Sequence, residues 1–348
     1  MQVLGIETSC DETAAAVVRD GYEVRSHVVL SQIEQHRPYG GVVPEIASRA
    51  HVEALPRVID SALTQAGADW CDIDRIAVTH GPGLASSLLI GVTAAQALAA
   101  RTGIPLTGIN HLAGHVYSIF LDPERPAVPA LFPMVVLLAT GGHTLLVRVD
   151  GVNRYHVLGQ TLDDAVGEAL DKGAALMGLG YPGGPAIEQA AQGGNPAFHD
   201  FPRGLQRGRG PWRGPFRLDR CFSFSGLKTA LLYALRAHPA WAQGEQRRDL
   251  AASYQEAAFD ALLDRLERVL REEKVQHFAC VGGVASNERL RAKLGELASR
   301  CSAHLHVAPA TYCTDNGAMI AGLAGALAAD GLAPVPPEDV YPGLSLSG

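Results

Sequence analysis

The sequence lacks the marks of several large protein classes. Its longest apolar run, Met134 to Ala139, is far too short to cross a lipid bilayer. No basic start followed by a cleavable apolar core marks a secretory signal. The six cysteines are scattered without a Cys-x-x-Cys pair, which is typical of free thiols in a reducing compartment. We therefore expect a cytoplasmic protein that has no membrane segment.

The sequence also lacks an excess of positive charge. A formal net charge of −7 argues against a strongly basic coat for nucleic acid, although it leaves room for a local basic patch. The Walker-type phosphate loop is missing too, because no glycine-rich segment ends in Gly-Lys-Ser/Thr. With 348 residues, the chain is long enough to form two domains.

A pattern of elements occurs twice along the chain. Each half has an apolar strand, a polar turn and a second strand, followed later by a strand, a glycine turn and a helix. The first copy comprises Val3–Ile6, Ala14–Val18, Ile76–Val78, Gly81–Gly83 and Ser86–Ala100. The second comprises Met134–Ala139, Leu145–Val149, Phe278–Val281, Gly282–Gly283 and Asn287–Leu297. The repetition predicts two α/β halves of related design with a cleft between them.

Further helices are expected between these landmarks. One covers residues 44–66 and begins with proline, which suits the first helical turn. Another covers residues 161–177, with Thr161 as its N-cap. A third covers residues 247–273 and repeats apolar residues at a four-residue step: Leu250, Tyr254, Ala258, Leu262, Leu266 and Leu270. Residues 193–220 are rich in Gly, Pro and Arg and indicate a long loop.

Two histidines four residues apart, His111 and His115, suggest a metal site. On a helix this spacing places both imidazoles on one face. Neutral imidazole is the commonest protein metal ligand, and Asp315 offers an oxygen donor far downstream. By itself the pair is equally compatible with histidines that pack in the core.

Two loops carry groups that suit phosphate or proton chemistry. The segment Ala139–Thr144 contains adjacent glycines and hydroxyls, so its amides can approach a phosphate, but an ordinary hairpin turn has the same composition. Asp11 and Glu12 stand side by side after the first strand. They can serve as a general base or a cation ligand, or lie solvated in a turn.

Two charged stretches also need an explanation. Asp164, Glu168 and Asp171 form an acidic stripe if residues 161–177 are helical, with Lys172 slightly to its side; a ligand or plain solvent can face it. The loop from 203 to 220 contains Arg203, Arg207, Arg209, Arg213, Arg217 and Arg220, with Phe201, Trp212 and Phe216 interleaved, and Asp219 is its only acid. Arginine with aromatics suits the phosphates and unstacked bases of RNA, and a solvated loop is the alternative.

Many motifs in order resemble one family, the bacterial tRNA threonylcarbamoyladenosine transferases of the TsaD family, formerly described as O-sialoglycoprotein endopeptidases. The similarity extends over nearly the whole chain. The residues that carry it are Leu4–Thr13, Tyr39–Glu45, Gly81–Leu84, His111 with His115, Gly141–Thr144, Tyr181–Pro185, Phe222–Lys228, Gly282–Val284 with Asn287, and Cys313–Met319.

The resemblance implies a fold and an activity. The fold is that of the actin-like, sugar-kinase and Hsp70-like ATPases, with duplicated α/β subdomains at residues 1–125 and 126–348 and a helical insertion at about 160–275. The activity is transfer of a threonylcarbamoyl group from threonylcarbamoyl-AMP to the exocyclic amine of an adenosine. That adenosine lies 3′ of the anticodon in tRNAs that read codons beginning with A, and AMP is released.

The resemblance also implies site residues, which we state as expectations. The metal ligands are His111, His115 and Asp315, holding one Fe²⁺ or Zn²⁺, between which the sequence does not choose. The substrate contacts are Leu138, Ala139, Thr140, Gly141, Gly142, Asp171, Gly184 and Asn287. Asp11 or Glu12 is the candidate for accepting or orienting the amine proton. Arg207, Arg209 and Arg213 are candidates for tRNA contacts.

The resemblance implies partners as well: tRNA, an inactive paralogue of the same fold that pairs through N-terminal helices around residues 44–66, and a P-loop ATPase. Three positions depart from the family pattern. Thr140 replaces a common serine, Asn110 replaces a common histidine, and the stretch 203–217 is longer than usual.

Three alternative functions remain to be weighed. A zinc protease of the His-Glu-x-x-His type needs a glutamate after its first histidine, and Leu112 stands there instead. An ATPase or sugar kinase of the same fold predicts rapid ATP turnover without tRNA. A non-catalytic paralogue serving as a scaffold is expected to lack the two histidines and the aspartate.

Overall fold

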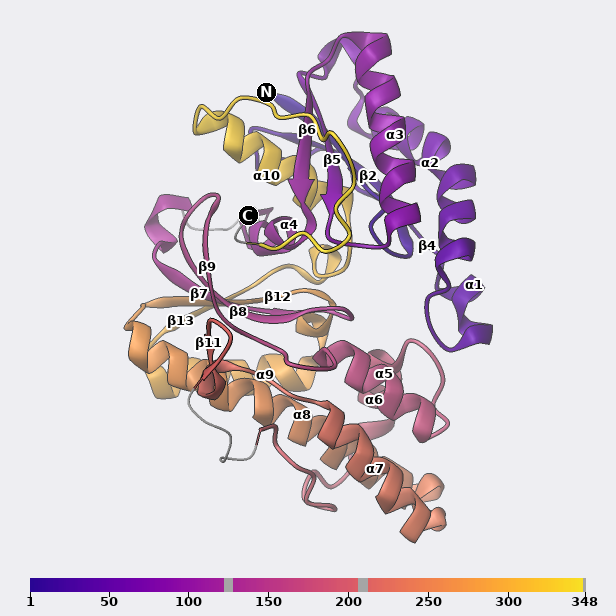
Figure 1. Cartoon of the computed structure of the whole chain (residues 1–348), viewed down its shortest axis with the longest axis vertical. Coiled ribbons are helices and arrows are strands. Elements are labelled where there is room, and N and C mark those ends of the chain that lie inside the picture. Colours follow the sequence, from indigo (N-terminus) through magenta and orange to yellow (C-terminus); the bar gives the residue numbers. More distant parts are fainter. Residues whose placement is uncertain (122–127, 206–211, 347–348) are drawn as a thin grey trace. The chain divides into compact units, whose positions relative to one another are not determined.

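The computed structural model describes residues 1–121, 128–205 and 212–346 (Figure 1). Two compact units account for the chain, and each is described by itself. Unit 1 comprises residues 1–131, 151–155 and 308–348, and unit 2 comprises residues 132–150 and 156–307. The subdomain boundary at residue 125 stays a prediction from the sequence.

Unit 1 is built on a sheet whose strands follow the order β3-β2-β1-β5-β6, with β4 also paired to β2. The strands are β1 (Gln2–Glu7), β2 (Glu12–Arg19), β3 (Glu23–Val24), β4 (Val28–Ser31), β5 (Arg75–Gly81) and β6 (Leu106–Asn110). β1 and β2 form the antiparallel hairpin that the sequence predicts, whereas β5 and β6 run parallel to β1.

Helices cover both faces of this sheet because β1 is apolar on both sides. Leu4 and Ile6 pack into a core with α2 (Pro44–Ala66) and α3 (Ala85–Thr102). On the opposite face α10 (Gly317–Ala329) lies so close that a Cβ on Gly5 would stand 2.2 Å from the carbonyl oxygen of Gly317. The short helices α1 (Ile33–His36) and α4 (His111–Tyr117) also belong to this unit, and α4 carries both expected histidine ligands.

Unit 2 repeats the topology of unit 1. Its sheet has the order β9-β8-β7-β12-β13, in which an antiparallel hairpin again precedes two parallel strands. The strands are β7 (Met134–Ala139), β8 (Thr144–Gly151), β9 (Arg154–Gln160), β12 (His277–Val281) and β13 (His304–Val307). The two halves of related design that the sequence predicts are therefore present in the strand order.

Helices of unit 2 lie between β9 and β12 and after β12: α5 (Val166–Leu176), α6 (Gly183–Ala191), α7 (Ser225–Ala237), α8 (Gly244–Glu273) and α9 (Glu288–Cys301). The long helix α8 packs against β7, α6 and α9. Every residue of its predicted apolar face is buried, from Leu250 to Leu270. In Figure 1, α8 and α9 (orange) run side by side, as their contacts require.

Two expectations about unit 2 are wrong in detail. Helix α5 begins at Val166 with Ala165 as its N-cap, because Thr161 is held in a bridge with Phe222 and does not cap the helix. The predicted loop 193–220 contains a small hairpin, β10 (Trp212–Arg213) with β11 (Phe216–Arg217).

Because α5 begins late, Asp164 lies before the helix and the acidic stripe is not continuous. Lys172 reaches across it, with Nζ 2.9 Å from carboxylate oxygens of both Asp164 and Glu168. Within the described ranges, no helix combines the length and the apolar composition that crossing a membrane requires.

Candidate metal centre and substrate loop

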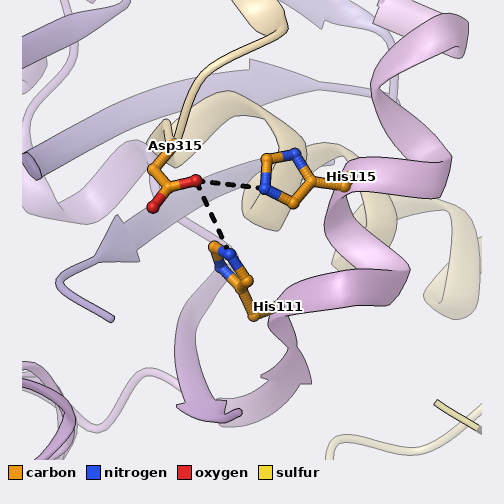
Figure 2. A group of neighbouring side chains, drawn as sticks. All are labelled: His111, His115 and Asp315. Atoms are coloured by element: carbon orange, nitrogen blue, oxygen red, sulfur yellow. Dashed lines mark hydrogen bonds and ion pairs between the residues drawn. The ribbon is translucent and has the colours of Figure 1, made fainter. Parts of the chain in front are cut away.

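The three expected metal ligands come together in unit 1 (Figure 2). His111 and His115 lie on successive turns of α4, and the side chain of Asn110 caps that helix by accepting hydrogen bonds from the amides of Leu112 and Ala113. Asp315 lies just before α10, whose N-cap is Asn316. Asn110 is thus explained as a helix cap.

The geometry of this trio fits a metal ion. Asp315 Oδ1 lies 3.0 Å from His115 Nε2 and 3.5 Å from His111 Nε2, and Figure 2 shows the carboxylate directed at both rings. Metal–ligand bonds of about 2.0–2.2 Å place the donor atoms of one ion roughly 3–3.5 Å apart. Both imidazoles are buried, so few water molecules compete for them. The donor set of two histidines and a carboxylate suits ferrous iron or zinc.

A fourth residue, Glu7, contacts the ring nitrogen of His111 that does not face Asp315. It is fully buried at the end of β1, and its Oε2 lies 3.2 Å from His111 Nδ1. Its carboxylate also accepts hydrogen bonds from the Ser9 amide and the Thr79 hydroxyl. Such a carboxylate orients a metal-binding imidazole and makes it more basic. Glu7 is not among the site residues expected from the sequence, although a carboxylate ending an otherwise apolar strand is a signal for a functional role.

The charges in this cluster shift the ionisation of its members. Burial by itself would lower the pKa of His111, but the carboxylates of Asp315 and Glu7 outweigh it and raise that pKa to about 9. Burial raises the pKa of Glu7, yet its interactions with His111 and Ser9 bring it below the ordinary value. Without a metal, His111 and Glu7 therefore form a buried ion pair, and a metal must displace a proton from His111.

The acidic loop lies in the same unit. Asp11 is buried and Glu12, the first residue of β2, is partly buried. Desolvation and the nearby charges of Asp315 and Asp11 raise the pKa of Glu12 well above its ordinary value. A carboxylate with a raised pKa is a stronger base than a solvated one, which suits proton transfer. The solvated-turn alternative does not match this burial.

The expected substrate loop lies in unit 2, at the end of β7. Gly141 and Gly142 are exposed, have no positive φ, and have nothing within 4 Å of the place where a Cβ would stand. Neither a positive φ nor a close neighbour therefore requires glycine at these two positions, and the turn is open to solvent. The hydroxyl of Thr140 accepts a hydrogen bond from the His143 amide and closes the turn.

Two other glycines allow neighbouring elements to pack closely against this loop. A Cβ on Gly167, in the first turn of α5, would stand 2.6 Å from the carbonyl oxygen of Thr140. A Cβ on Gly282 would stand 2.5 Å from the carbonyl oxygen of Ala139. The N-terminal turn of α5 and the glycine turn after β12 thus contact the loop closely.

The other expected substrate residues of unit 2 have structural partners of their own. Asp171 Oδ1 accepts a hydrogen bond from the Gly183 amide at 2.7 Å, and Gly184 lies in the first turn of α6. Asn287 caps α9 through Leu290 and donates to Gln255 Oε1 at 2.9 Å. These contacts fix the orientation of the Asp171 and Asn287 side chains.

The arginine-rich stretch is only partly described. Arg207 and Arg209 lie outside the described residues, as does the side chain of Arg213. Among the others, Arg203 pairs with Asp200 and Asp260, and Arg217 and Arg220 pair with Glu272. Asp219 is therefore not the only acid that meets these arginines, since α8 supplies several. Phe201 is buried and cannot stack on a base.

Solved structures define the class of fold. HypF of T. kodakarensis superposes with a TM-score of 0.60 at 15% identity, covering 96% of this chain and 48% of HypF. Component A of the (R)-2-hydroxyglutaryl-CoA dehydratase of Acidaminococcus fermentans superposes with a TM-score of 0.53 at 15% identity, covering 94% and 99% of the two chains. The protein thus has the fold of the actin-like ATPases, as expected.

Sequence relatives define the family. The TsaD profile, described as tRNA N6-adenosine threonylcarbamoyltransferase, matches residues 23–322. A curated relative of that name from Trichlorobacter lovleyi is 48% identical and covers 92% of this chain and 90% of its own length. Another, from Salinibacter ruber, is 49% identical and covers 99% of this chain and 100% of its own length. The chain belongs to the TsaD family, and the expected membership is confirmed.

Proposed function

We propose that the protein transfers the threonylcarbamoyl group from threonylcarbamoyl-AMP to the N6 amine of the adenosine 3′ of the anticodon, in tRNAs that read codons beginning with A. The amine nitrogen forms a bond to the carbamoyl carbon. The bond from that carbon to the phosphate oxygen breaks, AMP leaves with the electron pair, and the amine loses a proton. The observation that carries the proposal is the His111–His115–Asp315 trio in a chain of this family.

The trio provides the metal chemistry in this proposal. His111, His115 and Asp315 would hold one divalent ion, Fe²⁺ or Zn²⁺, with Glu7 orienting His111. When bound, such an ion supplies Lewis acidity to a substrate oxygen. Asp11 or Glu12 accepts or orients the amine proton, and the raised pKa of Glu12 makes it a suitable base.

The loop of unit 2 provides the nucleotide contacts. Within the loop Leu138–Gly142, the backbone amides of Gly141 and Gly142 hold the adenylate phosphate, and Asp171, Gly184 and Asn287 contact the nucleotide. The exposure of Gly141 and Gly142 supports this role. Arg207, Arg209 and Arg213 bind the tRNA backbone.

We propose the remaining expectations as they follow from the family resemblance: a cytoplasmic enzyme that pairs with an inactive paralogue through helices around residues 44–66 and works with a P-loop ATPase. The kinase-like and scaffold alternatives have no observation in their favour. The scaffold is expected to lack the metal trio that this chain has.

Direct transfer from synthetic threonylcarbamoyl-AMP to unmodified tRNA tests the proposal. We expect AMP release to match modified adenosine one for one, and an Asp315→Asn variant to lose at least 90% of the rate. Zinc and ferrous iron, added separately to metal-stripped protein, identify the ion that restores turnover. Rapid ATP hydrolysis by the isolated protein, with no tRNA product, would instead support the kinase-like alternative.

A further inference from the structure

A buried chain of polar side chains in unit 1 connects the segment before α2 to the acidic loop. Its members are His36 on α1, Gln32 just before α1, and His51 on α2, and each is at most 1% exposed. This series of hydrogen bonds begins at the backbone amide of Val43 and ends at the carbonyl oxygen of Cys10. Buried polar groups of this kind are costly unless each one has its partner.

The hydrogen bonds of this chain all run in one direction. The Val43 amide donates to His36 Nδ1 at 3.3 Å, so the ring carries its proton on Nε2, which lies 3.2 Å from Gln32 Oε1. The side-chain nitrogen of Gln32, Nε2, lies 3.3 Å from His51 Nδ1 and donates to it. His51 Nε2 then carries a proton and donates to the Cys10 carbonyl at 2.9 Å.

His51 is neutral in this arrangement, and its environment favours that form. Burial, the largest influence, lowers the pKa of its imidazole. The Thr13 hydroxyl lies 2.8 Å from Nδ1 and adds a second donor to the nitrogen that accepts from Gln32. Every polar atom of the His51 ring is thereby satisfied.

These hydrogen bonds fix the backbone on both sides of Asp11. His51 holds the carbonyl of Cys10, which belongs to the peptide group before Asp11. The backbone amide of Gln32 donates to the carbonyl of Asp11 itself, at 3.0 Å. Two successive peptide groups are thus fixed, and with them the directions in which Asp11 and Glu12 project.

We propose that His51 and Gln32 are positioning residues that hold the Cys10–Glu12 loop in the geometry that proton transfer requires. The proposal rests on the proposed role of Asp11 or Glu12 in the transfer reaction. Neither positioning residue touches the substrate, so the effect is on the rate of the chemical step and not on substrate binding. Misplacing a reacting group by about 1 Å can cost on the order of 100-fold in rate.

A set of matched variants of the full-length protein, assayed in the reconstituted reaction, tests the proposal. His51→Leu removes all three polar contacts of the ring and keeps most of the volume, whereas His51→Gln keeps an amide that can reach the Cys10 carbonyl. Gln32→Met breaks the side-chain link but keeps the backbone bond to Asp11. His80→Leu is the control, because it removes a partly buried imidazole of the same unit that packs on Tyr341.

We expect His51→Leu to lower kcat by about 10- to 100-fold, with the KM for threonylcarbamoyl-AMP within twofold and the metal content unchanged. His51→Gln should recover part of the loss, Gln32→Met should lower kcat less than His51→Leu, and His80→Leu should keep the wild-type kcat. Thermal unfolding of each variant shows whether it is folded, and Gln32→Met provides the comparison if His51→Leu is not.

The deciding comparison uses a variant whose acidic loop is neutral, Asp11→Asn with Glu12→Gln. If His51 acts through these carboxylates, adding His51→Leu to that variant lowers kcat by less than twofold further. A full, multiplicative loss in that background would mean a purely structural role and overturn the proposal. A neutral-loop variant with wild-type kcat would overturn it too, while wild-type transfer activity would still uphold the proposed function.

Discussion

Replacing Glu7 with glutamine should change how the metal affinity depends on pH. Glu7 is fully buried with Oε2 3.2 Å from His111 Nδ1, and glutamine keeps its shape without its charge. A pKa of about 9 leaves roughly 1% of His111 neutral at pH 7, so displacing the proton weakens apparent binding on the order of 100-fold. This penalty falls tenfold per pH unit and disappears above pH 9.

The substitution has two opposing effects. Losing the carboxylate behind a metal-binding histidine weakens intrinsic affinity by about 10- to 100-fold. It also removes one of the two charges that raise the pKa of His111. Less of the variant's His111 is therefore protonated near neutral pH, and displacing that proton weakens metal binding less. We therefore expect a loss of about 10- to 100-fold at pH 9 that shrinks markedly at pH 7.

Competition between the protein and a zinc-binding dye from pH 6.5 to 9.5 measures this effect. Wild-type affinity should rise about tenfold per pH unit up to pH 9, whereas the Glu7→Gln curve should level off at a lower pH. Glu23→Gln is the control, because this carboxylate on β3 pairs with Arg25 at the surface and should leave the curve unchanged. Parallel wild-type and Glu7→Gln curves would refute the coupling between Glu7, His111 and the metal.

Two further predictions concern stability and the substrate loop. Since the pKa of His111 is raised, its ion pair with Glu7 stabilises metal-free protein fully below pH 6.5 and is lost as the pH rises through about 9. The Tm should therefore fall over that range in metal-free wild type and less in Glu7→Gln; equal changes would contradict the ion pair. Gly167→Ala should cost about 1–3 kcal/mol and slow transfer, because its Cβ meets the Thr140 carbonyl at 2.6 Å. Gly141→Ala has free space for its Cβ, so it should keep the wild-type Tm, and only a bound ligand could make it harmful.

The parts of the fold that follow a strong local pattern could be predicted from the sequence. The two hairpins, the strand–turn–helix units and the apolar face of α8 have periodicities that burial dictates. The residues of α2 match the predicted range, because proline begins it and Gly67 ends it with a positive φ. The predicted start of α5 was wrong because Thr161 forms a bridge with Phe222, a contact distant in the sequence that no local pattern reveals.

The candidate site was predictable in part for the same reason. The spacing of His111 and His115 is local, but the expected third ligand, Asp315, lies 200 residues from His115, and no local pattern links it to the pair. Glu7 was missed because its role depends on tertiary neighbours. The pairing of Arg203, Arg217 and Arg220 with acids of α8 likewise needed the tertiary structure.

Mass analysis of tRNA tests the central claim most directly. Unmodified tRNA is incubated with threonine, bicarbonate, ATP and the companion enzymes, with this protein, without it, or with its His111→Ala/His115→Ala variant. We predict the mass of threonylcarbamoyl on the adenosine 3′ of the anticodon with the wild-type protein only. Modified adenosine formed without the protein, or formed equally well by the variant, would contradict the account.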